Sequence, residues 1–388
     1  MSNSEWKTYR LGEAVLSANT GLDAIKRAPI VKEDTGIKCL RIQDISQEKT
    51  FPNWGFCDVN EINYHKFQLK KDDLIIARTG ETVGVNRLIK ENLKAVFNNG
   101  LIRIRVDENK LNPLFLYYSF QSSIFRNHIN SIARGTSTQP NMRIEALLDY
   151  NIEIPDHKTQ QRIASILSSL DEAIELNQQI NKTLEEMAKA IFKEWFVYFN
   201  YPNATSIFQE TEIGKIPYGW EVGKLNEVLE IKYGKDHKHL ESGEIPVYGS
   251  GGIMRYADKA LYKFESILIP RKGTLSNLFY INKPFWSVDT MFYTKFKLAN
   301  SGKYLFHLLQ SLNLATLNVG SAVPSLTTEV LNNILIAIPT KEVLLKFEEV
   351  VSSLFEQIEQ NIVENQSLIN LRDNLLPKLM KREININL

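Results

Sequence analysis

The chain has 388 residues, of which 43% are hydrophobic and 23% charged, and its formal net charge is +1. This length is enough for two domains with separate cores, and the composition is typical of a soluble globular protein. The two cysteines make a reducing cytoplasm the default location. There is no run of about 18–20 apolar residues and no signal-peptide pattern at the start, so we expect no association with membranes. Cys39 and Cys57 have neither CxxC spacing nor a neighbouring His cluster, which argues against a disulfide framework and a zinc site.

Residues 1–155 form the first predicted globular domain. Short β-rich runs occupy residues 73–77 and 100–106, and a helix is predicted over residues 113–128. Lys and Arg outnumber Asp and Glu by 21 to 18 in this domain, a small excess that suits contact with a polyanion. Short strands and helices without regular alternation predict the α+β class.

Residues 156–199 are predicted to be one long helix, followed by a linker over residues 200–219. An apolar seven-residue period runs through this helix, and its a positions are Ile163, Leu170, Asn177, Leu184 and Ile191. Neighbouring positions extend the apolar stripe with Ile166, Leu167, Ala173, Ile174, Ile180 and Met187. A strict heptad period predicts a left-handed coiled coil.

Residues 220–339 form the second predicted domain, with strands over 266–270 and 291–296 and a helix over 303–314. Lys and Arg outnumber Asp and Glu by 13 to 10 here. The domain repeats landmarks of the first one: the motif Ile-Glu-Ile-Pro at 152–155 returns as Ile-Ala-Ile-Pro at 336–339, in each case before a long helix. A period this long indicates a duplicated domain-plus-helix unit rather than a solenoid.

Residues 340–388 form the second predicted long helix, with a positions Phe347, Leu354, Asn361, Leu368 and Leu375. Its stripe is extended by Val350, Val351, Ile358, Leu371 and Leu379. Each helix has one Asn at its central a position, and a buried Asn fixes register when it meets a polar partner.

An antiparallel pair places Asn177 near Asn361, and we favour it because the short linker lets the chain fold back. A parallel pair in register also matches them, and both Asn residues facing solvent on separate helices is the remaining alternative. The predicted fold is therefore α+β, with two mixed α/β domains separated by an antiparallel two-helix coiled coil. Helices of this length would hold the two domains apart like a ruler.

Several stretches resemble the DNA-specificity (S) subunit of type I restriction-modification systems. They are the segment 212–222 that follows the Phe-Lys-Glu-Trp-Phe motif at 192–196, the motif 245–252, the motif 375–379, and the Gln-Gln-Arg-Ile-Ala start of the helix at 160–164. The resemblance covers essentially the whole chain, and the order of the motifs agrees with the repeat. It implies a non-catalytic subunit with two target-recognition domains that bind a gapped, asymmetric double-stranded DNA sequence. It also implies docking of two methyltransferase (M) subunits on the helices and, in the full complex, of restriction/translocase (R) subunits.

Candidate DNA contacts in the first domain lie in turns and polar loops. Arg78 and Thr79 precede a glycine after a β run, where a basic side chain and the backbone can approach a phosphate or a guanine edge. The loop 135–141 offers hydroxyls and amides to phosphates, or it is a hinge between domain and helix. Its candidate residues, with the flanking arginines, are Arg134, Ser137, Thr138, Gln139 and Arg143. Asn98 and Asn99 match adenine readout, or they form a β-turn.

The second domain has candidates at corresponding places. Arg271 and Lys272 precede a glycine after a β run, and Ser321 and Ser325 lie in the loop before the second helix. A Gly-rich, aromatic and basic stretch adds Lys235, Lys238, Tyr248 and Ser250. The arginine turn is equally compatible with an ordinary solvated turn, the loop with a hinge between domain and helix, and the Gly-rich stretch with a turn that is common in α+β domains.

Motifs for catalysis are not found in the sequence. We find no GxxxxGK[ST] loop, no Gly-rich cofactor loop, no Asn/Asp-Pro-Pro-Tyr motif and no HExxH, so we expect no cofactor, no metal site and no enzymatic activity. Two alternatives remain open: a coiled-coil assembly scaffold whose domains bind ligands other than DNA, and an enzyme with an unrecognised nuclease site.

Overall fold

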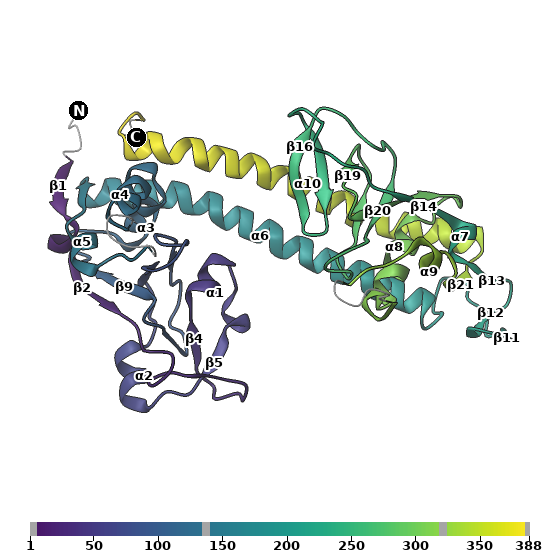
Figure 1. The fold of residues 1–388 in the computed structure, drawn as a ribbon, viewed down its shortest axis with the longest axis horizontal. Helices are drawn as coiled ribbons and strands as arrows, with labels where there is room; N and C mark the ends of the chain where they lie inside the picture. The colour runs from purple at the N-terminus through teal and green to yellow at the C-terminus, as the bar shows by residue number, and fades with distance from the viewer. Residues whose placement is uncertain (1–5, 134–139, 318–323, 385–388) are drawn as a thin grey trace. The chain divides into compact units, whose positions relative to one another are not determined.

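The computed structural model describes residues 6–133, 140–317 and 324–384. The chain forms two compact units, the first made of Met1–Leu176 with Glu364–Leu388 and the second of Asn177–Val363. Each unit contains one globular part and segments of both long helices, α6 (His157–Phe196) and α10 (Lys341–Met380), drawn in teal and yellow in Figure 1. The division predicted from the sequence, into two globular domains, two long helices and a linker, is a different one and stays a prediction.

The globular part of the first unit combines short strands with short helices. Its strands are β1 (Lys7–Arg10), β2 (Val15–Thr20), β3 (Ile30–Val31), β4 (Lys38–Leu40), β5 (Gly55–Cys57), β6 (Leu74–Ala77), β7 (Asn86–Leu88), β8 (Ala95–Phe97), β9 (Leu101–Val106) and β10 (Asn151–Ile154). Its helices are α1 (Ile42–Ser46), α2 (Glu61–Phe67), α3 (Pro113–Gln121), α4 (Ser123–Ala133) and α5 (Ile144–Leu148), with 3-10 turns η1 (Leu11–Ala14) and η2 (Phe51–Asn53). The strands form sheets in the orders β1-β10, β2-β9-β6-β7 and β3-β5-β4-β8.

The globular part of the second unit repeats this plan. Its strands are β11 (Phe208–Thr211), β12 (Gly214–Pro217), β13 (Glu221–Lys224), β14 (Leu229–Tyr233), β15 (Ile245–Gly249), β16 (Gly252–Ala257), β17 (Ser266–Pro270), β18 (Phe279–Ile281), β19 (Trp286–Ser287), β20 (Met291–Phe296) and β21 (Leu335–Ile338). Its helices are α7 (Leu225–Val228), α8 (Gly302–Ser311) and α9 (Thr328–Asn332), with the 3-10 turn η3 (Leu314–Leu317).

Each of the three sheets of the first unit has a counterpart in the second, whereas the β11-β12 hairpin of the second unit has none in the first. The order β14-β20-β17-β18 matches β2-β9-β6-β7, and β13-β21 matches β1-β10. In the remaining sheet, the parallel pair β15 and β19 matches the parallel pair β4 and β8. The units differ at one edge, because β3 covers β5 in the first unit whereas β16 is an edge strand in the second.

Buried strands form the centre of each globular part. All residues of β6 and of β17 are buried, as expected for apolar runs that are covered on both faces of a sheet. The helix predicted over residues 113–128 is two helices, because Ser122 has an extended backbone. The Ser122 hydroxyl donates to Ser119 O at 2.6 Å, and the break lets Phe120 and Phe125 stack with ring centroids 3.7 Å apart.

The helices α6 and α10 run antiparallel, as each unit shows independently. In the first unit, Arg372 donates to Asp171 at 2.8 Å and Asn365 donates to Ile174 O at 3.4 Å. In the second unit, Asn361 pairs with α6 at Asn181, and Phe347 packs on Trp195 with ring centroids 5.7 Å apart. In both cases a later residue of α6 meets an earlier residue of α10, so the predicted antiparallel pairing is confirmed.

The register of the polar pair differs from the prediction. Asn361 is 4% exposed and its Nδ2 donates to Asn181 Oδ1 at 2.7 Å, whereas the sequence placed Asn177 opposite it. The partner of Asn361 thus lies four residues, about one helical turn, after Asn177.

The heptad a positions are all buried or half-buried, but part of the extended apolar stripe is not. Its exposed members are Ile166, Ile180, Met187, Val350 and Leu371. Two helices can bury only one seam between them, so the flanking apolar positions remain at the surface. None of the helices in the described ranges is long and apolar enough to cross a bilayer.

Candidate nucleic-acid interface

Four chain segments meet beside the end of strand β6 in the first unit, and we call them loop cluster 1. They are residues 20–22, 78–80, 97–100 and 140–142. Thr79 pairs with Asn141 in a β-bridge, and the Gly80 amide donates to Pro140 O at 3.0 Å. The Met142 amide in turn donates to Arg78 O at 2.7 Å. The arginine turn after β6 is therefore fixed against the polar segment that leads to the long helix.

The second unit builds the same arrangement, loop cluster 2, from residues 233–235, 271–273, 287–290 and 324–326. Lys272 pairs with Ser325 in a β-bridge, the Gly273 amide donates to Pro324 O at 3.2 Å, and the Leu326 amide donates to Arg271 O at 2.9 Å. These contacts match those of loop cluster 1 one by one. Gly80 and Gly273 have φ values of +81° and +90°, which explains why a glycine closes both turns.

The other segments of the clusters also correspond. The Arg78 amide donates to Gly100 O and the Arg271 amide to Thr290 O, both at 2.9 Å. A Cβ atom on Gly21 would lie 2.1 Å from Phe97 O, and one on Gly234 would lie 2.0 Å from Val288 O. Only glycine permits this approach of backbone to backbone, so the two glycines position the segments that border the arginine turns.

The two arginine side chains are oriented by different partners. Arg78 Nη2 donates to Asn141 Oδ1 at 3.2 Å, and Arg78 Nε is buried without a hydrogen-bond partner among the described residues. Arg271 Nη1 donates to Asp289 O at 3.2 Å, and its guanidinium carbon lies 5.3 Å from the centre of the Tyr233 ring. A guanidinium has five N–H donors, so both side chains retain donors for a phosphate or a base edge.

The remaining candidates have mixed environments. Asn99, Arg143, Lys235, Lys238 and Lys272 are exposed, and Thr79, Asn98, Ser250 and Ser325 are half-buried. The Leu101 amide donates to Asn98 O at 3.1 Å, which closes the turn that was the alternative prediction, and the amides of Asn98 and Asn99 donate to Leu40 O and Leu22 O. Arg134, Ser137, Thr138, Gln139 and Ser321 lie outside the described residues.

Tyr248 is a core residue, and we correct its assignment as a DNA contact. It is 6% exposed, packs on Phe279 with ring centroids 5.7 Å apart, and belongs to the cluster that includes Phe285 and Trp286. Burial raises the pKa of its hydroxyl to about 12. The Gly-rich motif around it looked like a surface loop, but the first part of that motif is the central strand β15.

Hydrogen bonds to neighbouring segments hold the loop that carries Lys235 and Lys238. The Lys235 amide donates to Ser287 O at 2.9 Å, and Trp286 Nε1 donates to Lys235 O at 3.0 Å. Arg255 Nη2 bridges His237 O and Leu240 O at 2.5 and 2.9 Å. The loop is therefore held while both lysine side chains extend into solvent.

Asn141 and Tyr233 were not predicted as site residues. Both lay within stretches that the sequence singled out, but no local signal distinguished them from their neighbours. Only the packing of distant segments brings each of them against an arginine. The repeated Arg-x-Gly turn was the one usable signal, since it pointed to both arginines.

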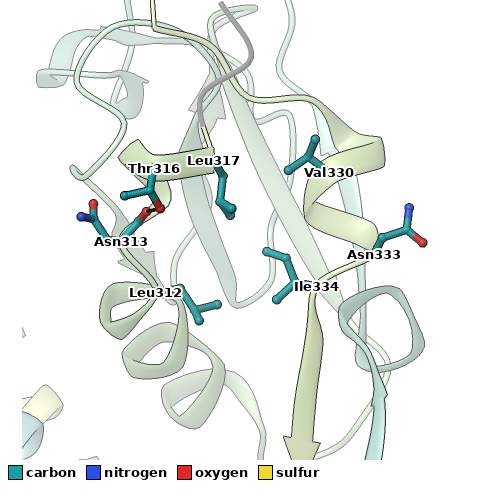
Figure 2. A pocket seen from close by; sticks show the side chains of 7 residues that line it. All are labelled: Leu312, Asn313, Thr316, Leu317, Val330, Asn333 and Ile334. Carbon is teal, nitrogen blue, oxygen red and sulfur yellow. Dashed lines mark hydrogen bonds between the residues drawn. The ribbon is translucent and has the colours of Figure 1, made fainter. Parts of the chain in front are cut away.

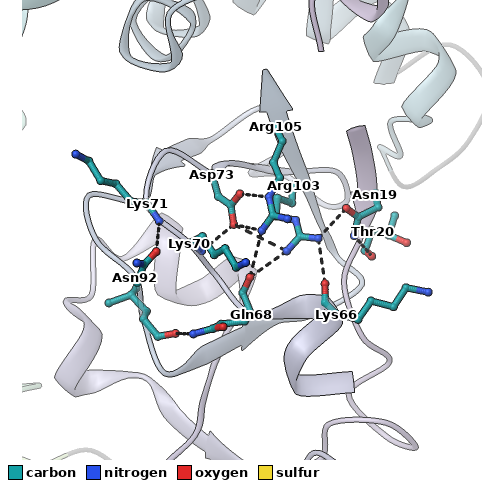
Figure 3. Close-up of polar contacts among 11 residues, drawn as sticks. Asn19, Thr20, Lys66, Gln68, Lys70, Lys71, Asp73, Asn92, Arg103 and Arg105 are labelled. Atoms are coloured by element: carbon teal, nitrogen blue, oxygen red, sulfur yellow. Dashed lines mark hydrogen bonds and ion pairs between the residues drawn. The ribbon is translucent and has the colours of Figure 1, made fainter. Parts of the chain in front are cut away.

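A second cluster of polar side chains in the first unit, around Asp73, stabilises the fold (Figure 3). Asp73 is 1% exposed and accepts from Arg105 Nε at 2.5 Å, from Arg105 Nη2 at 3.1 Å and from the Lys70 amide at 2.8 Å. Arg103 Nη1 lies 3.9 Å from Asp73 and donates to Gln68 O at 3.0 Å. Burial lowers the pKa of Arg103 to about 10. This network ties β9 to the segment after α2 and is unsuited to contact a ligand.

The second unit has a pocket between α8, η3 and α9 (Figure 2). It is lined by Leu312, Asn313, Thr316, Leu317, Val330, Asn333 and Ile334. None of these seven side chains is titratable, so the described lining of the pocket offers no acid or base. Within the described ranges, no group of three or more His, Cys, Asp or Glu side chains is placed to hold a metal ion.

Comparison with known proteins decides the family. The sequence matches the family described as Type I restriction modification DNA specificity domain over residues 3–186 and 217–371. The chain belongs to this family. The two matched regions are the two repeats found in the sequence, so each globular part of this specificity protein is a family domain. The family that the motifs indicated, and the α+β fold with two such domains, are confirmed.

Named relatives agree with this result. The type I restriction enzyme HindI specificity subunit of Haemophilus influenzae is 24% identical and covers 98% of this chain and 100% of its own length. The MjaIX specificity subunit of Methanocaldococcus jannaschii is 28% identical over 70% of this chain and 69% of its own. The crystal structure of the type I S subunit from M. genitalium has the same fold, with a TM-score of 0.62, 20% identity and coverage of 98% of this chain and 97% of that one.

Proposed function

We propose that this specificity protein is a non-catalytic subunit whose two globular domains read the two halves of a bipartite, asymmetric DNA site. The observation that carries the proposal is the recurrence of the loop cluster in both units with different side chains. Thr79 in the first cluster corresponds to Lys272 in the second, and Asn141 corresponds to Ser325. The same backbone arrangement with different side chains suits two domains that recognise different base sequences.

The arginine turns would supply contacts to base edges or phosphates. Arg78 and Arg271 present planar donor groups, which pair in a bidentate manner with guanine or phosphate oxygens. The exposed Lys235, Lys238 and Lys272 would add phosphate contacts to the second domain. Methylation and cleavage would be supplied by M and R subunits that assemble with this chain.

The experiment is sequencing of methylated sites in cells that contain the assembled methyltransferase with wild-type or variant specificity protein. We expect an asymmetric, gapped motif, of which Arg78→Ala relaxes one half and Arg271→Ala the other. The matched control is Arg126→Ala, an exposed arginine on α4 that donates to the neighbouring Gln121 O. A continuous palindromic motif, or identical effects of both variants, would contradict the proposal.

Docking of M subunits would use the exposed apolar positions of the long helices. Met187 on α6 is 46% exposed and Val350 on α10 is 45% exposed, although both belong to the apolar stripe. Exposed apolar side chains on paired helices are typical of surfaces that a partner covers. We expect Met187→Glu and Val350→Glu to weaken assembly with the M subunit without changing the melting temperature, whereas Glu186→Gln, a change of charge at a neighbouring exposed position, should have no effect on assembly.

The length of the helices would determine the gap between the half-sites. Each helix has 40 residues, which corresponds to roughly 60 Å at about 1.5 Å per residue. Insertion of four residues into both helices at facing positions should therefore widen the non-specific spacer of the motif. A spacer of unchanged length would rule out this part of the proposal.

A further inference from the structure

We propose that Tyr233 is a positioning residue that orients the Arg271 guanidinium for readout of one half-site, and that Asn141 serves Arg78 in the other domain by a different contact. The inference rests on the proposed function and adds how each arginine is directed. It concerns two residues that do not themselves need to touch DNA.

The Tyr233 ring is held in place although it is 51% exposed. Tyr233 is the last residue of β14 and pairs with Phe292 of β20, whose ring lies at 71° to its own with centroids 5.1 Å apart. Phe292 is completely buried, and the Tyr233 hydroxyl lies 3.5 Å from Thr328 Oγ1. Gly234 comes next, where the close backbone approach to Val288 O fixes the chain. The ring is therefore a rigid platform at the surface.

The guanidinium of Arg271 lies over the face of this ring and also donates to a neighbouring carbonyl. Its guanidinium carbon lies 5.3 Å from the ring centre, and Nη1 donates to Asp289 O at 3.2 Å. The cation–π contact restricts the position of the guanidinium over the ring, and the hydrogen bond from Nη1 restricts its rotation. The remaining donors thus have a defined direction, which bidentate recognition of a base requires.

Loop cluster 1 lacks the ring and has a carboxamide instead. Thr20 ends β2 as Tyr233 ends β14, and each is followed by a glycine in the same backbone contact. Arg78 is held by a hydrogen bond from Nη2 to Asn141 Oδ1 at 3.2 Å, at the place where the second cluster has Ser325. The two clusters therefore hold their arginines through different contacts, a ring from the end of β14 in one and a carboxamide from the segment after α4 in the other.

The test uses the specificity protein assembled with its methyltransferase subunits and measures methylation rates on the cognate site and on sites changed at one base pair. Tyr233→Leu removes the ring face. We expect the ratio of methylation rates on the cognate and changed sites to fall about 2- to 5-fold, the equivalent of an exposed cation–π contact. The fall should occur only at the bases that Arg271→Ala affects. Tyr233→Phe keeps the face and should retain wild-type discrimination. Asn141→Ala should lower discrimination at the Arg78 bases, and Asn141→Asp should preserve it.

The combination of variants separates positioning from a structural role. If Tyr233 acts through Arg271, Tyr233→Leu should have no further effect on discrimination in the Arg271→Ala background. Additive losses, equal losses in both half-sites, or unchanged discrimination by Tyr233→Leu would overturn the inference while leaving the proposed function intact. Unchanged discrimination by Arg271→Ala would instead overturn both, since it removes the residue through which Tyr233 acts.

Discussion

The Asp73 network allows a quantitative prediction for the stability of the first unit. Asp73→Asn keeps the shape of the side chain but removes the negative charge that faces Arg103 and Arg105. Arg103 is only 5% exposed, and burial already lowers its pKa to about 10, so its charge would be left uncompensated in the interior. Breaking a buried ion pair by removing one partner costs about 3–5 kcal/mol, a large part of the 5–15 kcal/mol that stabilises a typical domain.

The assay is urea unfolding combined with hydrogen exchange of the β6 and β9 amides, which reports on the first unit alone. With an m value of about 1–3 kcal/mol/M, the midpoint for this unit should fall by at least 1 M. The control is Glu61→Gln, which removes a carboxylate that is 88% exposed beside His65 and should leave the midpoint in place. A loss below about 1 kcal/mol for Asp73→Asn would refute the reasoning that the pair is electrostatically isolated from water.

Further predictions concern pH, the helix pair and salt. Burial lowers the pKa of His307 to about 4, so between this pH and about 6.5 the unfolded state binds a proton that the folded state does not. The free energy of unfolding should therefore be full above about pH 6.5 and fall by about 2 kcal/mol at pH 5. His307→Gln should remove this loss in urea titrations. Asn361→Leu removes the donor to the Asn181 side-chain oxygen and should cost about 1–3 kcal/mol in thermal unfolding, most of which the double replacement by Leu restores; equal stability of both variants would contradict the pairing. Lys272→Ala should reduce the slope of log binding constant against log salt by about 1, whereas Thr79→Ala should not change it; equal slopes would exclude a phosphate contact by Lys272.

Local patterns predicted the regular parts of the fold well. The strands over 266–270 and 291–296 have the predicted bounds, because each is a short apolar run ended by turn chemistry. The a positions of both helices face inward, since a seven-residue period leaves one stripe for the partner. The break at Ser122 was not predicted, because the apolar period continues past it. Its hydroxyl caps the ends of α3 and α4, and the break permits the Phe120–Phe125 stack, a contact that the sequence does not display.

The sites depended on contacts between distant segments, which one sequence does not display. The Arg-x-Gly turns pointed to Arg78 and Arg271, but the residues that orient them lie 63 positions later in one case and 38 earlier in the other. Tyr248 was assigned to the surface because a Gly-rich motif surrounds it, although its strand lies in the middle of a sheet. The burial of a residue in a short strand depends on its neighbouring strands, and these were not known.

The end of the chain completes the core of its beginning. Leu379 and Met380, at the end of α10, are buried in the same apolar cluster as Leu11 and Ile152, and Arg382 lies 4.9 Å from the ring of Trp6 and 2.7 Å from Glu153. Figure 1 shows β1 and the end of α10 at this unit. During synthesis the first domain therefore keeps an open apolar surface until Leu379 and Met380 have left the ribosome, while the second domain already has most of its own core. A truncated chain or a premature stop would consequently damage the domain that was translated first.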